Sequence, residues 1–335
     1  MPETFTLDDA SVVLVWTAIA IYALAFIAYA IDLARRSAAA VDTQDAVVRE
    51  LVLAGGGETL AQVQAGEAEA AASLVARGRD RDRPLWARIG TSLTWLGFLF
   101  HVGGDVTRGI AAGRVPWSNM YEFALTGTML IVAVYLVVLF RYDLRFLGAF
   151  ITGLVVLLLG GATLGFHVDV TPLSDPLKSV WLVIHVFVAS LATALFSLAF
   201  ALSVAQLLQA RRERRAAAGL KAGPRFLRLL PSAEALESLA YRFAIIGFIF
   251  WTFTLIAGSI WANDAWGRYW GFDTKEVWTF IIWVLYAGYI HARATRGWRG
   301  TRSAWLSIIG FSAVMFNFTI VNMFFKGLHV YSGLS

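Results

Sequence analysis

Residues 180–207 read VWLVIHVFVASLATALFSLAFALSVAQL, a run that contains no Asp, Glu, Lys or Arg. About 20 apolar residues in a helix are enough to cross the roughly 30 Å hydrocarbon core of a bilayer. Similar runs recur along the chain, and the alternation expected of a membrane-spanning barrel is absent. We therefore predict an all-α fold, a polytopic transmembrane helical bundle with about eight spans. The expected spans are residues 11–33, 85–104, 121–140, 146–165, 180–207, 238–260, 276–294 and 303–323.

The composition of the chain is that of a membrane protein. Of its 335 residues, 58% are hydrophobic and 15% are charged, whereas a soluble domain carries about a quarter charged residues. The formal net charge of +5 does not indicate nucleic-acid binding, because the basic residues gather in alternate connections and so encode topology. The chain has no cysteine, which excludes disulfides and thiolate ligands. Its five histidines are then the strongest candidate ligands for a metal.

The charges around the spans predict the orientation of the bundle. Asp8 and Asp9 precede the first span, and Arg35 and Arg36 follow it. This order is the reverse of that in a secretory signal peptide, so we interpret the span as a permanent anchor with its N-terminus outside. Alternation then places the basic connections in the cytoplasm and both termini on the extracytoplasmic side. These connections are residues 34–84, 141–145, 208–237 and 292–302.

Two regions differ in composition. Residues 1–84 comprise the anchor span and an insert that is rich in Ala, Gly, Glu and Gln between positions 40 and 75. We expect this insert to be a flexible or loosely helical cytoplasmic segment. Residues 85–335 form the membrane domain. They contain no internal repeat, no phosphate-binding glycine loop and no catalytic serine signature, so we assign no catalytic residue.

One connection between two spans is unusually aromatic. Residues 261–278, the tryptophan segment, read WANDAWGRYWGFDTKEVW and hold four of the chain's 13 tryptophans. We expect such a segment to lie against lipid headgroups, protein or a planar ligand, and an aromatic belt at the membrane interface is the simplest alternative. If residues 264–277 are helical, Trp266, Trp270 and Asp273 fall on one stripe, which presents two indoles together.

Charged residues end the tryptophan segment. Asp273, Lys275 and Glu276 lie at the boundary with the next span, where a short ion-pair network could hold the segment in place. Gly267 and Gly271 would allow a flat ligand to approach the backbone closely.

The pattern resembles the tryptophan-rich WWD signature of haem-handling membrane proteins, carried here by Trp261, Trp266–Trp270 and Asp273–Trp278. Two further segments agree with this resemblance. Residues 115–122, VPWSNMYE, are similar to a PxxNxYE loop of that family, and residues 177–185, LKSVWLVIH, are similar to its histidine-bearing span. The chain thus resembles the CcsA/ResC branch, the cytochrome c assembly proteins of system II, over most of its membrane domain.

The resemblance implies that residues 85–335 handle haem b as a substrate, with two histidines on its iron. The chain departs from the family pattern at Phe272, where Trp is usual, and at Thr274, where Pro is usual. The residues that the resemblance assigns to haem contact are Trp261, Trp266, Arg268, Tyr269, Trp270, Asp273, Lys275, Glu276 and Trp278. Haem propionates also need cations, and the sequence does not choose among the external candidates. These candidates are Arg114, Lys178, Arg268, Lys275 and Lys326.

The histidines form an outer and an inner set. His185 lies near the external start of its span, and His329 follows the last span. Two imidazoles can hold haem iron from opposite faces, and these two match the external axial ligands of the family. A solvent-exposed tail histidine is the alternative for His329. His291 lies about 22 Å deeper, at 1.5 Å per helical residue, and by resemblance binds haem at an inner position. We expect His101 and His167 to be structural or loop histidines.

The resulting hypothesis is haem delivery across the membrane and attachment to apocytochrome c on the extracytoplasmic side. The apocytochrome supplies the thiols of a CxxCH segment, which add to the haem vinyl groups. A ResB-type partner subunit is expected to donate the second inner ligand, and the chain would be one component of a cytochrome c synthase (haem lyase). The alternatives are a haem exporter or chaperone without synthase activity, and a non-catalytic assembly scaffold. The Ala, Val and Arg bias favours a bacterial plasma (inner) membrane.

Overall fold

The computed structural model describes residues 5–53, 85–173, 178–220, 223–295, 298–325 and 327–328. Within these ranges the chain forms helices and connections without any strand, which confirms the all-α prediction. The long helices are α1 (Leu7–Leu53), α3 (Leu85–Ala112), α4 (Met120–Leu139), α5 (Gly148–Gly165), α6 (Val180–Ala217), α7 (Ala233–Trp266), α8 (Thr274–Ala294) and α9 (Thr301–Phe318). The short elements are the 3₁₀ turns η1 (Arg145–Leu147) and η3 (Arg225–Leu229) and the helix α10 (Ile320–Phe324).

Each expected span coincides with helical structure, and the last is divided between α9 and α10. Six helical segments are long and apolar enough to cross a membrane, namely those of α1, α4, α5, α6, α7 and α9. The helices α3 and α8 are not among them. Charged residues such as Asp105 and Arg108 interrupt α3, and α8 is rich in Trp and Tyr. The full count of eight spans therefore stays a prediction.

The anchor helix is longer than expected. The span was predicted over residues 11–33, whereas α1 continues to Leu53 and so includes the first part of the expected insert. The remainder of that insert, residues 54–84, lies outside the described residues.

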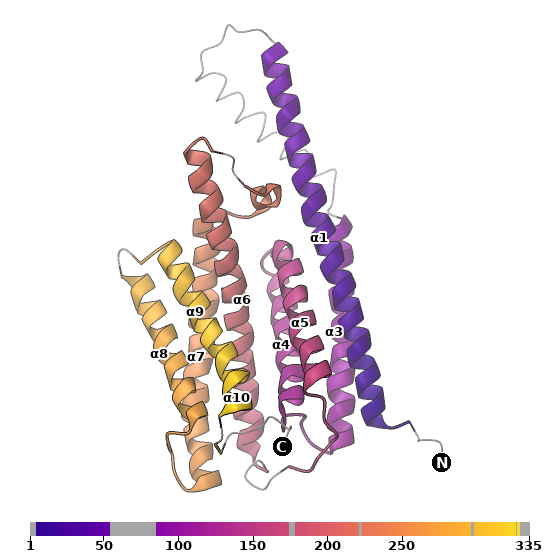
Figure 1. Cartoon of the computed structure of the whole chain (residues 1–335), viewed down its shortest axis with the longest axis vertical. Helices are drawn as coiled ribbons and strands as arrows, with labels where there is room; N and C mark the ends of the chain where they lie inside the picture. Colours follow the sequence, from indigo (N-terminus) through magenta and orange to yellow (C-terminus); the bar gives the residue numbers. More distant parts are fainter. Residues whose placement is uncertain are drawn as a thin grey trace.

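The helices form two groups that pack side by side (Figure 1). In the first group α1 packs along α3 and α5; in the second, α6 packs along α7 and α9, and α8 packs on α9. The helix α4 joins the groups because it contacts both α5 and α6. Aromatic packing is tight inside the second group, where the rings of Phe196 in α6 and Tyr286 in α8 stack with centroids 3.6 Å apart.

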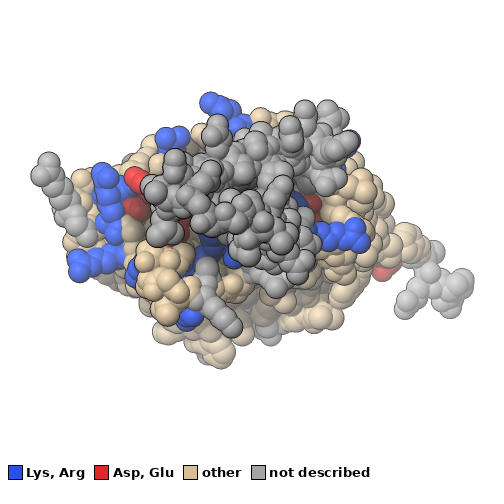
Figure 2. Space-filling model, turned by 90° about the horizontal axis from the view of Figure 1, so that it is seen from above, with Lys and Arg blue, Asp and Glu red and all other residues tan. Residues whose placement is uncertain are grey.

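Successive connections alternate between the two ends of the bundle (Figure 1). The start of α1 and the α3–α4, α5–α6 and α7–α8 connections lie at one end, while the α4–α5 and α6–α7 connections lie at the other. Figure 2 views this second end and shows Lys and Arg side chains around its rim. Residues 211–215, RRERR, lie in the last two turns of α6 at this end. The arrangement agrees with the predicted alternation, and the cytoplasmic assignment of the basic end remains a prediction.

Candidate functional site

An apolar cavity of about 390 Å³, here called the central cavity, lies where the two helix groups meet. Side chains of α4, α5, α6, α7, α9 and α10 line it, together with Lys275 at the start of α8. Most of these side chains are apolar, including Leu158, Leu182 and Val314. Some lining residues lie at helix starts, such as Met120 in α4 and Lys275 in α8. The cavity therefore reaches toward the end of the bundle where the α7–α8 connection lies.

His185 lines the central cavity from the second turn of α6. Its Nδ1 lies 3.1 Å from the backbone carbonyl oxygen of Thr254 in α7. A carbonyl oxygen only accepts, so Nδ1 carries the hydrogen, and in the neutral ring Nε2 holds the lone pair. Histidines that bind metals commonly donate their other ring N–H to a backbone carbonyl in this way. The hydrogen bond therefore sets the tautomer that an iron ligand requires.

A close approach of α7 to α6 seats the His185 ring. A Cβ placed on Gly258 would stand 2.7 Å from Cε1 of His185 and 3.0 Å from its Nδ1, which leaves no space for a side chain at this position. The indole of Trp261 lies next to the imidazole, with ring centroids 5.6 Å apart, and also lines the central cavity. Thr254, Gly258 and Trp261 share one face of α7 because they are four and three residues apart.

Lys275 provides a cation at the wall of the central cavity. Its Nζ lies 2.5 Å from Oδ1 of Asn322 in α10. Lys275 precedes the expected span 276–294, and burial lowers its pKa to about 8 while the carboxylate of Asp273 opposes this shift. A lysine with this pKa is mostly protonated at neutral pH, and an anionic partner would stabilise its charged form.

Among the described residues, no other cation expected to bind propionates lines this cavity. Arg114 donates to Glu122, and Arg268 pairs with Glu276. Lys178 is not part of the lining. Lys326 lies outside the described residues.

The tryptophan segment is not one helix. The helix α7 continues through Trp266, and Gly267 ends it with a left-handed φ of 69°. Residues 268–273 are not helical. The prediction of a single helical stripe over 264–277 is therefore wrong, because glycine in this conformation terminates a helix. As a consequence, Trp266 and Trp270 do not share a face of one helix.

Two carboxylates order the non-helical part of the tryptophan segment. The side chain of Glu276 accepts hydrogen bonds from the backbone N–H of Gly271 (2.8 Å) and Asp273 (3.1 Å), and it pairs with Arg268 at 3.4 Å. Asp273 caps α8 by accepting from the backbone N–H of Lys275 at 2.9 Å. Asp273 and Glu276 also form a capping box, in which each side chain accepts from the backbone N–H of the other residue. Of the predicted short ion-pair network, the described residues show one pair, Arg268 with Glu276, whereas Lys275 bonds to Asn322 instead.

Asp273 also holds the C-terminal part of the chain. Its Oδ2 accepts from the backbone N–H of Leu328 at 2.6 Å. A Cβ on Gly327 would lie 2.6 Å from the same oxygen, so this close contact requires glycine. The next residue is His329, the expected outer ligand, which lies outside the described residues.

Of the nine residues expected to contact haem, Trp261 and Lys275 line the central cavity. Trp278 packs toward the core, with its ring 4.4 Å from that of Phe316. The side chains of Tyr269 and Trp270 are exposed at the surface. The remaining four belong to the turn and network of the tryptophan segment, namely Trp266, Arg268, Asp273 and Glu276.

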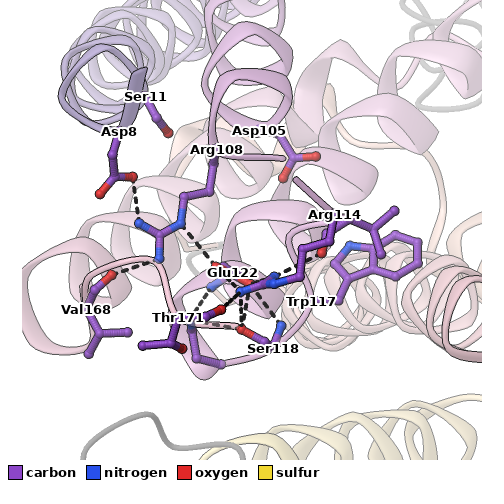
Figure 3. A network of polar contacts seen from close by, with 12 residues as sticks. Asp8, Ser11, Asp105, Arg108, Arg114, Trp117, Ser118, Glu122, Val168 and Thr171 are labelled. Carbon is purple, nitrogen blue, oxygen red and sulfur yellow. Dashed lines mark hydrogen bonds and ion pairs between the residues drawn. The ribbon is translucent and has the colours of Figure 1, made fainter. Parts of the chain in front are cut away.

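The segment 115–122 forms a structural polar network (Figure 3). Asn119 caps α4 by accepting from the backbone N–H of Glu122 at 2.9 Å. The buried carboxylate of Glu122 accepts from Arg108 at 3.1 Å and from Arg114 at 2.7 Å. The two arginines come from α3 and from the connection that follows it, so this network fixes the start of α4 against α3.

Arg108 extends this network to two further segments. Its guanidinium is fully buried and donates to Asp8 in α1 at 2.6 Å and to the backbone carbonyl of Val168 at 2.7 Å (Figure 3). Each of the three guanidinium nitrogens of Arg108 therefore donates to a group within the protein, which makes the side chain structural.

The other three histidines among the described residues do not line the central cavity. His291 is exposed near the far end of α8, 16 residues beyond Lys275 (291 − 275), which corresponds to about 24 Å along a helix. It therefore cannot share an iron with His185 in this arrangement. His101 is fully buried, with its ring nitrogens 3.3 Å from the Tyr22 hydroxyl and 3.0 Å from the Leu125 carbonyl. The ring of His167 packs edge-on against the ring of Tyr121, with centroids 4.9 Å apart.

Sequence reasoning missed several residues of the central cavity. Asn317 and Asn322 lie in the last apolar span, and buried amides in such a span are themselves a signal of function. Trp251 also lines the cavity, although a single tryptophan in a span gives no such signal. Gly258 became recognisable only when its contact with His185 was known.

Comparison with known proteins places these features in context. Residues 117–329 match the family described as "Cytochrome C assembly protein". The chain is 35% identical over 247 residues to the cytochrome c biogenesis protein CcsA of Guillardia theta, a match that covers 68% of this chain and 80% of that protein. It is 34% identical over 247 residues to CcsA of Prochlorococcus marinus, with 68% and 78% covered.

A solved structure shares the fold. The Cytochrome c Heme Lyase CcmF superposes on 95% of this chain with a TM-score of 0.61 and 16% sequence identity. The chain spans about half of that longer protein, 47% of its length. At this identity the similarity concerns the fold alone.

Proposed function

Because the chain belongs to the family of cytochrome c assembly proteins, we propose that it holds haem in the central cavity and presents it for attachment to apocytochrome c. One observation carries this proposal. The bond from His185 Nδ1 to the Thr254 carbonyl fixes the tautomer in which Nε2 carries the lone pair that iron binds, and His185 lines an apolar cavity. Bound there, haem supplies the iron that His185 binds and the vinyl groups that react.

The residues of the central cavity suit a porphyrin that carries acid groups. The apolar lining can cover the ring, and the indoles of Trp251 and Trp261 add flat surfaces. Lys275 supplies a positive charge at one wall. An imidazole, flat apolar surfaces and one cation together match the chemistry of haem.

We assign the second outer ligand to His329. The position of Leu328, held by the carboxylate of Asp273, supports this assignment because Leu328 directly precedes His329 in the chain. His291 is proposed as the inner ligand, paired with a residue of a ResB-type partner subunit. Its exposure at the far end of α8 is compatible with contact to another chain.

Haem is a substrate in this proposal, and the protein contributes its position. Each thiol of the apocytochrome adds across a vinyl group, with sulfur bonding one vinyl carbon and hydrogen the other, so no oxidant is consumed. The chain acts by proximity, since His185 and the cavity walls hold the reacting groups in place and exclude water. The exposed rings of Tyr269 and Trp270 are proposed to cover the haem edge outside the cavity.

The chain is a multi-pass membrane protein, as its apolar helices and its relatives indicate. We further propose that it lies in a bacterial plasma membrane with the tryptophan segment outside. The gathering of basic residues at the opposite end of the bundle supports this orientation (Figure 2).

The test is substitution of His185 and His329 by Ala, separately and together, in cells that express the partner subunit and an apocytochrome c. We expect covalent haem staining of the cytochrome to fall sharply in each variant. The matched control is His167→Ala, a histidine at the same end of the bundle whose side chain does not line the cavity. Normal cytochrome maturation in the double variant would overturn the proposal.

A further inference from the structure

The lining of the central cavity is mostly apolar, but besides His185 and several hydroxyl side chains it includes a lysine and two asparagines, here called the polar wall. This polar wall consists of Lys275, Asn317 and Asn322, which come from α8, α9 and α10. The two asparagines are nearly buried, with 5% and 3% of their surface exposed. Polar side chains in an apolar membrane interior are costly unless they bind one another or a ligand. The polar wall therefore needs an explanation from its contacts.

A break in the last span brings both asparagines to the cavity. In an unbroken helix, residues five apart point about 140° away from each other. Here α9 ends at Phe318, and α10 begins at Ile320 after Thr319, which has a ψ of −73°. Asn317 and Asn322 lie on either side of this break, and both line the cavity. The break thus builds the polar wall.

Both ends of the Asn322 amide form hydrogen bonds, and one of these bonds orients the lysine. Its Nδ2 donates to the Phe318 carbonyl at 2.7 Å, and its Oδ1 accepts from Nζ of Lys275 at 2.5 Å. An ammonium group has three donors, and Asn322 is its only hydrogen-bond partner among the described residues. The remaining donors are available to a ligand in the cavity.

Asn317 has unused hydrogen-bonding capacity. Its Nδ2 makes one long contact of 3.4 Å with the hydroxyl of Thr279, and its buried Oδ1 has no partner among the described residues. A buried polar atom without a partner costs about 1–3 kcal/mol. The amide nitrogen carries two hydrogens, and the contact with Thr279 uses only one of them, so one donor remains.

We propose that the polar wall is a subsite for a carboxylate of the bound porphyrin, which would accept hydrogen bonds from Lys275 and Asn317. This inference rests on the proposed function and deepens it. A buried cation beside an apolar cavity is stabilised by an anion in that cavity, in addition to the nearby Asp273 carboxylate, and one haem propionate is such a group. With His185 on the iron, a fixed propionate would set the rotation of the ring and hence the direction in which the vinyl groups point.

The experiment compares two ligands. One is haemin, and the other is haemin dimethyl ester, whose two carboxylates are esterified and carry no charge. Each is titrated into the purified full-length chain in complex with its partner subunit, and binding is followed by the Soret band. We expect the wild type to bind haemin about tenfold more tightly than the ester, the range of a hydrogen bond to a charged group. Lys275→Met should remove this preference by weakening haemin binding alone.

Two further variants sharpen the test. Lys275→Arg keeps the charge and should keep most of the preference for haemin, which also shows that the site still folds. Lys178→Met makes the same change at a lysine that does not line the cavity and should leave both affinities unchanged.

Equal affinity of the wild type for haemin and its ester would overturn the subsite while leaving haem binding in the cavity intact. Equal weakening of both ligands in Lys275→Met would overturn it as well. Failure of both ligands to bind the wild type would instead refute the proposed function, and this inference with it.

Discussion

At the scale of single residues, the buried carboxylate of Glu122 has a clear structural task. It is shared by Arg108 and Arg114, and both the Glu122 and Arg108 side chains are fully buried. Removing one member of a buried ion network leaves uncompensated charge, which is far more costly than losing an exposed pair. The polar residues of the motif 115–122 thus hold the fold near the cavity, and Met120 of the same motif lines it.

We predict that Glu122→Gln lowers the free energy of unfolding by about 3–5 kcal/mol, because two guanidinium groups then lose their shared negative charge. The matched control is Asp143→Asn. Its partner Arg145 lies 2.7 Å away, and the two side chains are 65% and 32% exposed, so a loss of about 0–1 kcal/mol is expected. Denaturant unfolding in detergent, followed by tryptophan fluorescence, measures both. Similar losses in the two variants would contradict this account.

At the scale of elements, the close packing of α6 against α7 positions the expected ligand. Periodicity and length predicted both helices but not their contact, and α6 continues ten residues beyond its expected span while α7 begins five residues earlier and ends six later. The sequence also placed Asp273, Lys275 and Glu276 correctly at a helix boundary, where Asp273 and Glu276 form a capping box. It did not reveal that α7 ends at Gly267, because an aromatic run containing glycines is compatible with a helix or a turn.

Gly258→Ala should displace the His185 imidazole, since the new methyl group would lie 2.7 Å from its Cε1. We expect weaker haem binding and a shift from a low-spin to a high-spin absorption spectrum. The control Gly288→Ala makes the same change in α8, where nothing lies within 4 Å of the added Cβ. That variant should bind haem as the wild type does. Indistinguishable spectra for the two variants would show that the α6–α7 contact does not seat the ligand.

At the scale of the whole molecule, the proposed haem site lies where the two helix groups meet. The sequence predicted the helical bundle, the alternation of its ends and His185, because long apolar runs and an ionisable residue within one of them are local signals. It could not predict the central cavity, since Lys275, Asn317 and His185 are brought together by tertiary packing alone. For the same reason, the sequence pattern indicated Trp266 and Trp270 as haem contacts and gave no sign of Trp251, which lines the cavity.

The most direct measurement is the absorption spectrum of the chain purified with its partner subunit from haem-replete cells, compared between the wild type and His185→Ala. We predict low-spin Soret and α bands for the wild type, loss of the signal from the outer haem in His185→Ala, and its recovery when imidazole is added to replace the missing ligand. Identical wild-type and His185→Ala spectra, with no response to imidazole, would contradict the claim that the central cavity binds haem through His185.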